Sequence, residues 1–217
     1  MKHGDGDSKG GGADVLVLAS ASPRRAELLQ QVGIAFEVRV SQVAEDGDVP
    51  GAEPAEVAEL HARQKALDVA AGAPLRLVLG ADTVVVLDGR VLGKPRDADD
   101  ARAMLRALSG RTHEVITGVA LALLRGADPE LIAQDHVRTQ VTFRELSEAE
   151  IEAYVMSGEP MDKAGAYGIQ GRGALLVEEI KGCYSNVVGL PLSRTWEMLG
   201  ASGRNVATSG AHRDGVR

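Results

Sequence analysis

The chain has 217 residues, of which 44% are hydrophobic, 25% are charged and only 3% are aromatic, and its net charge is −7. This composition is typical of a globular domain with an aliphatic core. The acidic charge argues against a nucleic-acid-binding protein, and no apolar stretch approaches the roughly 18–20 residues of a membrane helix. The single cysteine, Cys183, excludes an internal disulfide, and together with the polar amino terminus it predicts a cytoplasmic protein without a signal peptide.

Both ends of the sequence are predicted to be disordered. Residues 1–13 are mostly Gly, Asp, Ser and Lys, which cannot bury apolar surface. Residues 202–217 have a similar composition. The sequence therefore predicts one folded domain over residues 14–201.

The domain begins with a predicted strand, a tight turn and a helix. Residues 14–19 favour a buried strand, Ser22 fits the N-cap of the helix, and Pro23 fits its first position. Arg24 and Arg25 then lie in the first helical turn, where free backbone N–H groups and the helix dipole already favour an anion. Because acids usually occupy this turn, the two arginines favour a phosphate site over the alternative of solvated surface side chains.

The next segments are a strand, an acidic cluster and a helix. Residues 36–43 predict the strand, and residues 54–71 predict the helix. The acidic cluster at residues 45–48 (Glu-Asp-Gly-Asp) by itself indicates a turn more than a source of metal ligands. Lys65 lies on the predicted helix, and a single helical lysine by itself indicates a solvated side chain.

The most informative stretch is residues 79–86, Leu-Gly-Ala-Asp-Thr-Val-Val-Val. Its apolar and β-branched residues predict a largely buried strand, and Gly80 allows backbone or ligand to approach closely. Asp82 is costly to bury without a partner, so it is a candidate for catalysis or metal binding. The alternative is an aspartate at a strand end that caps a neighbouring turn, and these residues alone leave both possibilities open.

A hairpin turn is predicted directly after this strand, at Asp88-Gly89. Counted back from the turn, the pairing places Lys94 opposite Thr83 and one step from Asp82. Strict alternation puts the Lys94 and Asp82 side chains on opposite faces of the hairpin. A long lysine near the strand end can still reach the aspartate.

The second half of the chain predicts further helices and strands. They are a helix at 97–110, strands at 114–124 and 136–143, a helix after the capping box at 147–150, a strand at 174–180 and a helix at 191–199. Trp196, on the last helix, is predicted to be a core residue. Residues 159–171 have no periodicity, three glycines and several ligand-binding residue types, which is typical of a functional loop.

Four motifs together resemble the Maf family of nucleotide pyrophosphatases. They are Ser-Ala-Ser-Pro-Arg-Arg at 20–25, Gly-Ala-Asp-Thr at 80–83, Gly-Lys-Pro at 93–95 and Lys-Ala-Gly-Ala-Tyr-Gly-Ile-Gln-Gly at 163–171. The last motif resembles the dTTP/UTP-type subfamily rather than the 7-methyl-GTP type. The resemblance implies an elongated, two-lobed α/β fold around a twisted mixed β-sheet with a central cleft, related to the inosine-triphosphate pyrophosphatase fold. It also implies a possible homodimer.

The resemblance further implies catalytic, phosphate-binding, specificity and metal positions in this chain. The catalytic positions are Asp82, as the proton acceptor, with Lys65 and Lys94. The phosphate-binding positions are Ser20, Arg24 and Arg25. The specificity positions are Arg24, Thr83 and Gln170. The metal positions are Glu45 and Asp82.

The implied reaction is attack of water on the α-phosphorus of dTTP, UTP or a modified pyrimidine nucleotide, which gives the monophosphate and pyrophosphate. Cations must neutralise the phosphates, and oxygen ligands favour Mg²⁺ or Mn²⁺ as the cofactor. The expected partner is the nucleoside triphosphate, with no nucleic acid and no membrane. Two alternatives stay open: a non-catalytic nucleotide-binding regulator of cell division, and a nucleic-acid-binding protein, which the acidic charge disfavours.

Overall fold

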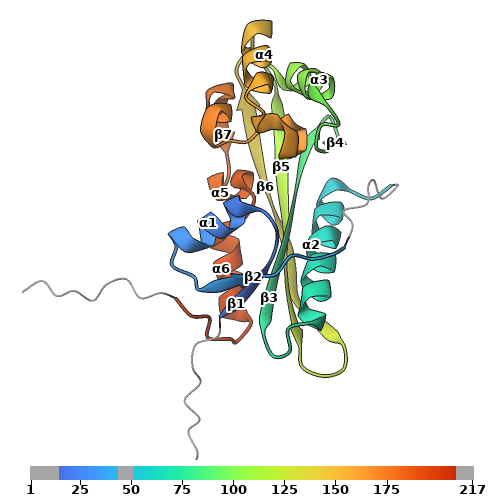
Figure 1. Cartoon of the computed structure of the whole chain (residues 1–217), viewed down its shortest axis with the longest axis vertical. Coiled ribbons are helices and arrows are strands. Elements are labelled where there is room, and N and C mark those ends of the chain that lie inside the picture. The colour runs from blue at the N-terminus through green and yellow to red at the C-terminus, as the bar shows by residue number, and fades with distance from the viewer. Residues whose placement is uncertain (1–14, 44–50, 209–217) are drawn as a thin grey trace, which may run out of the picture.

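In the computed structural model, which describes residues 15–43 and 51–208, seven strands form one mixed sheet along an elongated molecule (Figure 1). The strand order is β2-β1-β3-β5-β6-β7, and β4 pairs with β3. The strands are β1 Leu16–Ala19, β2 Phe36–Val38, β3 Leu77–Leu87, β4 Arg90–Leu92, β5 Thr112–Leu124, β6 Pro129–Phe143 and β7 Val177–Lys181. The mixed α/β fold predicted from the sequence is confirmed.

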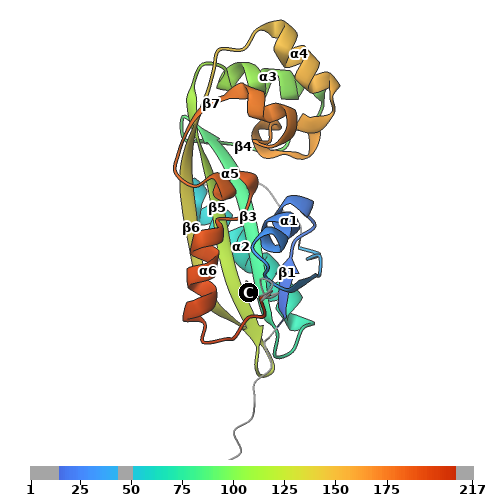
Figure 2. The same ribbon diagram turned by 90° about the vertical axis from the view of Figure 1, so that its left-hand side faces the viewer.

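Helices cover the sheet and divide the molecule into two lobes (Figures 1 and 2). They are α1 Pro23–Gln31, α2 Pro54–Ala71, α3 Ala98–Leu108, α4 Glu148–Met156, α5 Tyr184–Val188 and α6 Leu192–Ala201. In the lower lobe α2 covers one face of the sheet, and α1 and α6 cover the other. In the upper lobe α3 and α4 pack together beside the far ends of the long strands. None of the helices in the described ranges has both the length and the apolar character needed to cross a membrane.

The short strand β1 positions the start of α1 against the middle of the sheet. It is parallel to both β2 and β3, and all four of its residues are buried because helices cover both of its faces. Its last residue, Ala19, pairs with Gly80 on β3. The chain therefore leaves β1 close to Asp82, at the carboxyl end of a parallel strand, where ligands commonly bind in such sheets.

Helix α2 lies very close to the sheet because small residues meet on both sides of the contact. Its inward face carries the fully buried alanines Ala58, Ala62, Ala66 and Ala70. A Cβ atom at Gly80 on β3 would lie 2.2 Å from the Ala62 carbonyl oxygen, and one at Gly118 on β5 would lie 2.3 Å from the Ala58 carbonyl oxygen. Only glycine at these two positions allows the helix backbone to approach this closely.

Several predicted boundaries differ from the structure. The strand predicted at 36–43 ends at Val38, and the strand predicted at 136–143 already begins at Pro129. The strand predicted at 174–180 begins as the 3-10 helix Gly171–Leu176 and becomes β7 only at Val177. The start of β6 is polar and half-exposed, so it has no apolar alternation, and its pairing with β5 makes it a strand.

The prediction that Trp196 is a core residue is wrong. It is 54% exposed on α6, which instead buries Thr195, Met198 and Leu199. The residue type alone favours burial of a tryptophan. The position of a residue around the helix decides whether its side chain faces the core or the solvent.

The chain after α6 packs on the lower lobe as far as residue 208, instead of leaving as a tail at residue 202. Thr208 forms a β-bridge with Ile34, the Ala35 amide donates to the Ala207 carbonyl oxygen at 2.8 Å, and Val206 joins the core. Backbone hydrogen bonds, which composition does not reveal, hold this segment. The predicted disorder at residues 1–13 and from residue 209 onward lies outside the described residues.

We expect Gly118→Ala to lower the free energy of unfolding by about 1–3 kcal/mol, because the new methyl group would meet the Ala58 carbonyl oxygen and force α2 away from the sheet. Urea unfolding measures the loss. Gly126→Ala is the matched control: a Cβ atom there meets nothing within 4 Å, so its stability should stay within about 0.5 kcal/mol of the parent. Equal stabilities of the two variants would contradict the tight contact.

Candidate active site

A cavity of about 400 Å³ lies where β1 ends beside β3 and the segment after α4 comes down from the upper lobe. Eight of the nine residues singled out by the sequence line this cavity: Ser20, Arg24, Arg25, Lys65, Asp82, Thr83, Lys94 and Gln170. The ninth, Glu45, lies outside the described residues. The fold thus gathers residues from distant parts of the chain in one place, while their individual roles stay predictions.

Asp82 lies in β3 and its carboxylate is held at both oxygens. Lys65 Nζ donates to Oδ1 at 2.6 Å, and His61 Nδ1 lies 3.2 Å from Oδ2. Both partners come from α2, one helical turn apart, and Lys65 is only 6% exposed. The solvated lysine indicated by the helix alone is therefore wrong, because the close contact between α2 and the sheet buries Lys65 against Asp82.

The surroundings of Asp82 favour its ionised form. Burial alone would raise the pKa of this carboxyl group. The hydrogen bond from His61 and the positive charges of Lys65 and Arg25 outweigh burial, so the pKa of Asp82 lies below its ordinary value of 3.8. Asp82 is consequently an oriented carboxylate at neutral pH, and His61 donates its Nδ1 proton to it.

His61 is a residue of the candidate site that sequence reasoning missed. Its side chain is 11% exposed and contacts the carboxylate that the sequence made the centre of the site. The available signal was its spacing, since His61 precedes Lys65 by four residues and shares its face of the helix.

Arg25 is fixed in direction at the wall of the cavity. Its Nε donates to the Gly189 carbonyl oxygen at 2.8 Å, its Nη1 donates to Ser20 Oγ at 3.0 Å, and its Nη2 donates to Thr83 Oγ1 at 3.1 Å. The residue is only 9% exposed, so the alternative of a solvated surface arginine is wrong. A charge that is already immobilised has little conformational entropy left to lose when an anion binds.

Arg24 connects the two lobes at the edge of the cavity. Its Nη1 lies 3.3 Å from Oδ2 of Asp162, which follows α4, and Lys163 Nζ donates to Oδ1 of the same carboxylate at 2.6 Å. Both Asp162 and Lys163 line the cavity, and sequence reasoning gave neither a role, although Lys163 opens the motif at 163–171. One exposed carboxylate thus joins a cation of the lower lobe to a cation of the upper lobe.

Lys94 lines the same cavity as Asp82, but the strand ladder does not place it there. Strand β4 ends at Leu92, so the predicted pairing of Lys94 with Thr83 does not form. The neighbouring Gly93 carbonyl oxygen instead accepts a hydrogen bond from the Gly165 amide at 3.0 Å. The segment that carries Lys94 is therefore held by the loop of the upper lobe.

The predicted loop at 159–171 consists of short 3-10 turns, η1 Glu159–Asp162 and η2 Ala164–Ala166, and leads into η3 Gly171–Leu176. Gly165 and Ala166 adopt left-handed backbone conformations, with φ of 68° and 58°. A Cβ atom at Gly165 would lie 2.9 Å from the Val85 side chain, so the turn packs directly on β3. Gln170 is exposed, and within the described residues its amide side chain makes no hydrogen bond.

Tyr167 anchors this loop in the core of the upper lobe. Its hydroxyl oxygen lies 2.7 Å from Nε2 of His113 on β5, and both residues are buried. Burial lowers the pKa of His113 to about 4 and raises that of the Tyr167 hydroxyl, so both groups are neutral at physiological pH. A neutral hydrogen bond therefore ties one wall of the cavity to the sheet.

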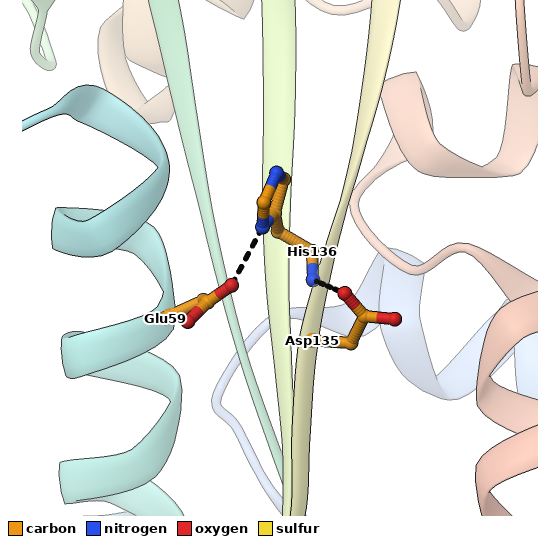
Figure 3. Close-up of side chains that lie close together, drawn as sticks. All are labelled: Glu59, Asp135 and His136. Carbon is orange, nitrogen blue, oxygen red and sulfur yellow. Dashed lines mark hydrogen bonds and ion pairs between the residues drawn. The ribbon is translucent and has the colours of Figure 1, made fainter.

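A second group of ligand-type side chains comprises Glu59, Asp135 and His136, whose ligand atoms lie within 4.8 Å of one another (Figure 3). Each is already engaged. His136 Nδ1 lies 2.6 Å from Glu59 Oε1, Gln134 Nε2 donates to Glu59 Oε2 at 2.6 Å, and Asp135 forms an ion pair with Arg194. Figure 3 shows Glu59 and Asp135 on opposite sides of His136. The contact of Glu59 with His136 fastens α2 to β6, and the ion pair of Asp135 with Arg194 fastens β6 to α6.

The fold and the cavity define a two-lobed α/β protein in which a buried carboxylate shares a cavity with several cations. Residues 15–202 match the family described as Maf-like protein, and the chain therefore belongs to the Maf family. This membership confirms the resemblance carried by the four sequence motifs.

Relatives with curated names agree with one another. A protein of Symbiobacterium thermophilum named dTTP/UTP pyrophosphatase is 56% identical over 196 residues, which cover 90% of this chain and 98% of the relative. A protein of Moorella thermoacetica with the same name is 56% identical over 194 residues, which cover 88% of this chain and 96% of the relative. A solved structure of a nucleoside-triphosphatase, or dITP/XTP pyrophosphatase, of Mycobacterium abscessus is 18% identical to this chain. The match covers 60% of this chain and 75% of the chain in that structure. Its TM-score of 0.37 is too low to add to the fold described above.

Acid is expected to destabilise the protein through His113. Its pKa is about 4 in the folded chain and 6.5 for an unperturbed imidazole, so between these pH values the unfolded chain binds the proton more readily. The free energy of unfolding should be unaffected by this group above about pH 6.5 and should fall toward pH 4, by roughly 2–3 kcal/mol. Urea unfolding at several pH values measures the fall. The His113→Leu variant should show a smaller fall in the free energy of unfolding. An equal fall in the parent and the variant would show that His113 is not the group responsible.

Proposed function

We propose that this chain is a nucleoside triphosphate pyrophosphatase that cleaves dTTP and UTP, or a modified pyrimidine nucleotide, to the monophosphate and pyrophosphate. The observation that carries the proposal is the buried Asp82 carboxylate, held by Lys65 and His61 at the wall of a cavity rich in cations. The two relatives named dTTP/UTP pyrophosphatase, which this chain matches over almost their whole length, support the same substrate class.

The cations of the cavity suit a triphosphate. They are Arg24, Arg25, Lys65, Lys94 and Lys163. Fixed positive charges neutralise the phosphates and the negative charge that develops on the departing pyrophosphate. Arg25 needs no rearrangement for this role because three hydrogen bonds already orient it.

Asp82 is proposed as the base. It accepts a proton from the water whose oxygen attacks the α-phosphorus, and the bond between the α-phosphorus and the bridging oxygen breaks, so that pyrophosphate leaves. Its lowered pKa keeps the carboxylate ionised at neutral pH, and the bonds from Lys65 and His61 fix its direction. The low pKa makes Asp82 a weak base, and its orientation compensates for this.

The donor set of the cavity fits Mg²⁺ or Mn²⁺. Each Asp82 oxygen has one protein donor in the hydrogen bonds above and keeps a further lone pair, and a magnesium ion commonly uses one or two carboxylates together with substrate phosphates. Asp82 would hold the ion, with Glu45, outside the described residues, as the second carboxylate. When bound, the ion would supply charge stabilisation to the phosphates.

The alternative function is a non-catalytic nucleotide-binding regulator of cell division. The pairing of Asp82 with Lys65, in one cavity with Lys94, favours chemistry over binding alone. Measurement of pyrophosphate release from dTTP and UTP by the purified chain with Mg²⁺ or Mn²⁺ decides between them, since nucleotide binding without release would indicate the regulator. The homodimer implied by the family resemblance stays a prediction.

Asp82→Asn should lower turnover by about 10²–10⁴-fold, because asparagine keeps the size of the side chain but cannot accept the proton. The variant also leaves Lys65 buried beside a neutral partner, so some loss of stability is expected and circular dichroism must show that the fold persists. Asp128→Asn, in an exposed loop, is the matched control and should retain the parent rate. A folded Asp82→Asn protein with more than about half of the parent activity would show that Asp82 is not the base.

Preference for dTTP and UTP over dCTP and CTP should amount to about tenfold to a hundredfold. Thymine and uracil offer an acceptor, a donor and an acceptor along one edge, and the Gln170 amide can match one donor and one acceptor. Cytosine presents a donor, an acceptor and an acceptor along that edge, so its first two groups are reversed, and the polar groups it leaves unpaired supply the penalty. Because an unrestrained Gln170 amide could flip to suit cytosine, this preference requires neighbouring groups in the loop at 165–171 to hold the amide in one orientation.

The measurement is pyrophosphate release from a panel of nucleoside triphosphates. Gln170→Ala should reduce the preference, whereas Gln140→Ala, on the exposed side of β6, is the matched control and should keep it. Equal rates on dCTP and dTTP in the parent would defeat the argument. A preference that survives Gln170→Ala would place base recognition elsewhere in the cavity.

A further inference from the structure

We propose that His113 is a positioning residue for nucleotide selection: its buried hydrogen bond to Tyr167 fixes the loop at 163–171, and this sets the preference between pyrimidine bases. The inference rests on the proposed function, since it concerns the choice of substrate at the same cavity. It assigns a role to a residue on β5 that does not line the cavity.

The geometry of the contact is specific. His113 is 2% exposed and Tyr167 is 5% exposed, with 2.7 Å between Nε2 and the phenol oxygen. Both rings also meet Phe143 edge to face, with ring centroids 5.1 Å and 4.7 Å from it. The Tyr167 side chain therefore has one direction in which its ring is packed and its hydroxyl is paired.

The hydrogen-bonded pair of His113 and Tyr167 contributes little to the stability of the fold. Among the residues that the structure describes, the buried Nδ1 atom of His113 has no hydrogen-bond partner, and the surrounding core is built from side chains such as Phe143 and Ile151. Two apolar side chains of similar shape would fill the same space without leaving a polar atom unpaired. The advantage of the polar pair is directional, because a hydrogen bond fixes an orientation that apolar packing leaves less defined.

The loop that Tyr167 anchors needs such a restraint. Gly165 and Ala166 both have positive φ, and for Ala166, which has a Cβ atom, this conformation is unfavourable. Strained residues of this kind persist only where their surroundings hold them. Tyr167 follows directly, so its bond to His113 acts at the point where the backbone would otherwise relax.

The restraint is transmitted directly to the cavity. Tyr167, Gly168, Ile169 and Gln170 are consecutive and all line it. The next amide, that of Gly168, donates to Tyr154 Oη at 3.2 Å, so Tyr167 and Gly168 together hold the backbone that leads to Gln170. Release of Tyr167 should therefore change how Gln170 meets the base while the phosphate-binding residues stay in place.

The test uses Tyr167→Phe, His113→Leu and the double variant, each assayed for kcat/KM with dTTP and dCTP. Every variant should lower the ratio of dTTP to dCTP by about 3- to 10-fold, the worth of one hydrogen bond. Each single variant leaves one buried polar partner unpaired and should melt at a lower temperature. The double variant removes both polar partners, so its melting temperature should recover toward the parent while its selectivity stays relaxed.

Phe143→Leu is the control for general loosening of this core. It removes ring packing, leaves the hydrogen bond in place, and should lower the melting temperature while the nucleotide ratio is retained. Recovery of selectivity together with stability in the double variant, or relaxed selectivity in Phe143→Leu, would overturn the inference in favour of a purely structural role. So would a parent that does not distinguish dTTP from dCTP.

Equilibrium affinities for the two nucleotides are measured on the same proteins. If the parent binds dTTP better than dCTP but releases no pyrophosphate, the proposed function fails, and the ratio of affinities across the variants still decides the inference.

Discussion

The close contact between α2 and the sheet is the constraint on which the candidate site depends. Gly118 has no side chain, so the backbone of α2 can contact the sheet directly at this point. The residues paired with Gly118 in the neighbouring strands are Asp82 on β3 and His136 on β6. Helix α2 is fastened to both neighbours, to His136 through Glu59 and to Asp82 through Lys65. A larger residue at the contact would push the helix away from the sheet and lengthen the pairs of Lys65 with Asp82 and of Glu59 with His136, which cross this contact.

The cavity belongs to neither lobe alone. The lower lobe supplies Asp82 and the rigid Arg25, and the upper lobe supplies the loop that carries Gln170. The ion pair of Arg24 with Asp162 connects the lobes at this point, and the backbone bond between Gly93 and Gly165 joins the segment of Lys94 to the same upper-lobe loop. Such a position between two packed units is common for ligand sites, because each unit can hold its groups rigidly while the space between them stays open.

Two buried polar arrangements flank this space, Asp82 with its partners and the His113–Tyr167 pair. Asp82 has charged and hydrogen-bonding partners at both oxygens, whereas the His113–Tyr167 pair leaves one nitrogen unpaired within the described part of the chain. Apolar residues would fill either place at lower cost. Their common property is that they hold groups in a single orientation beside the cavity, one at the proposed reaction centre and one behind the loop that we propose meets the base.

The sequence by itself determined the strand around Asp82, the helix start with two arginines, the irregular segment at residues 159–171 and, through four motifs, membership of the Maf family. These features are local, since periodicity, capping and motif spacing are properties of consecutive residues. Only the tertiary structure decided that Lys65 is buried, that His61 joins Asp82 and that Trp196 faces outward. Burial and pairing depend on which distant surface covers a residue, and α2 meets Asp82 only because small residues far apart in the chain let the two backbones touch.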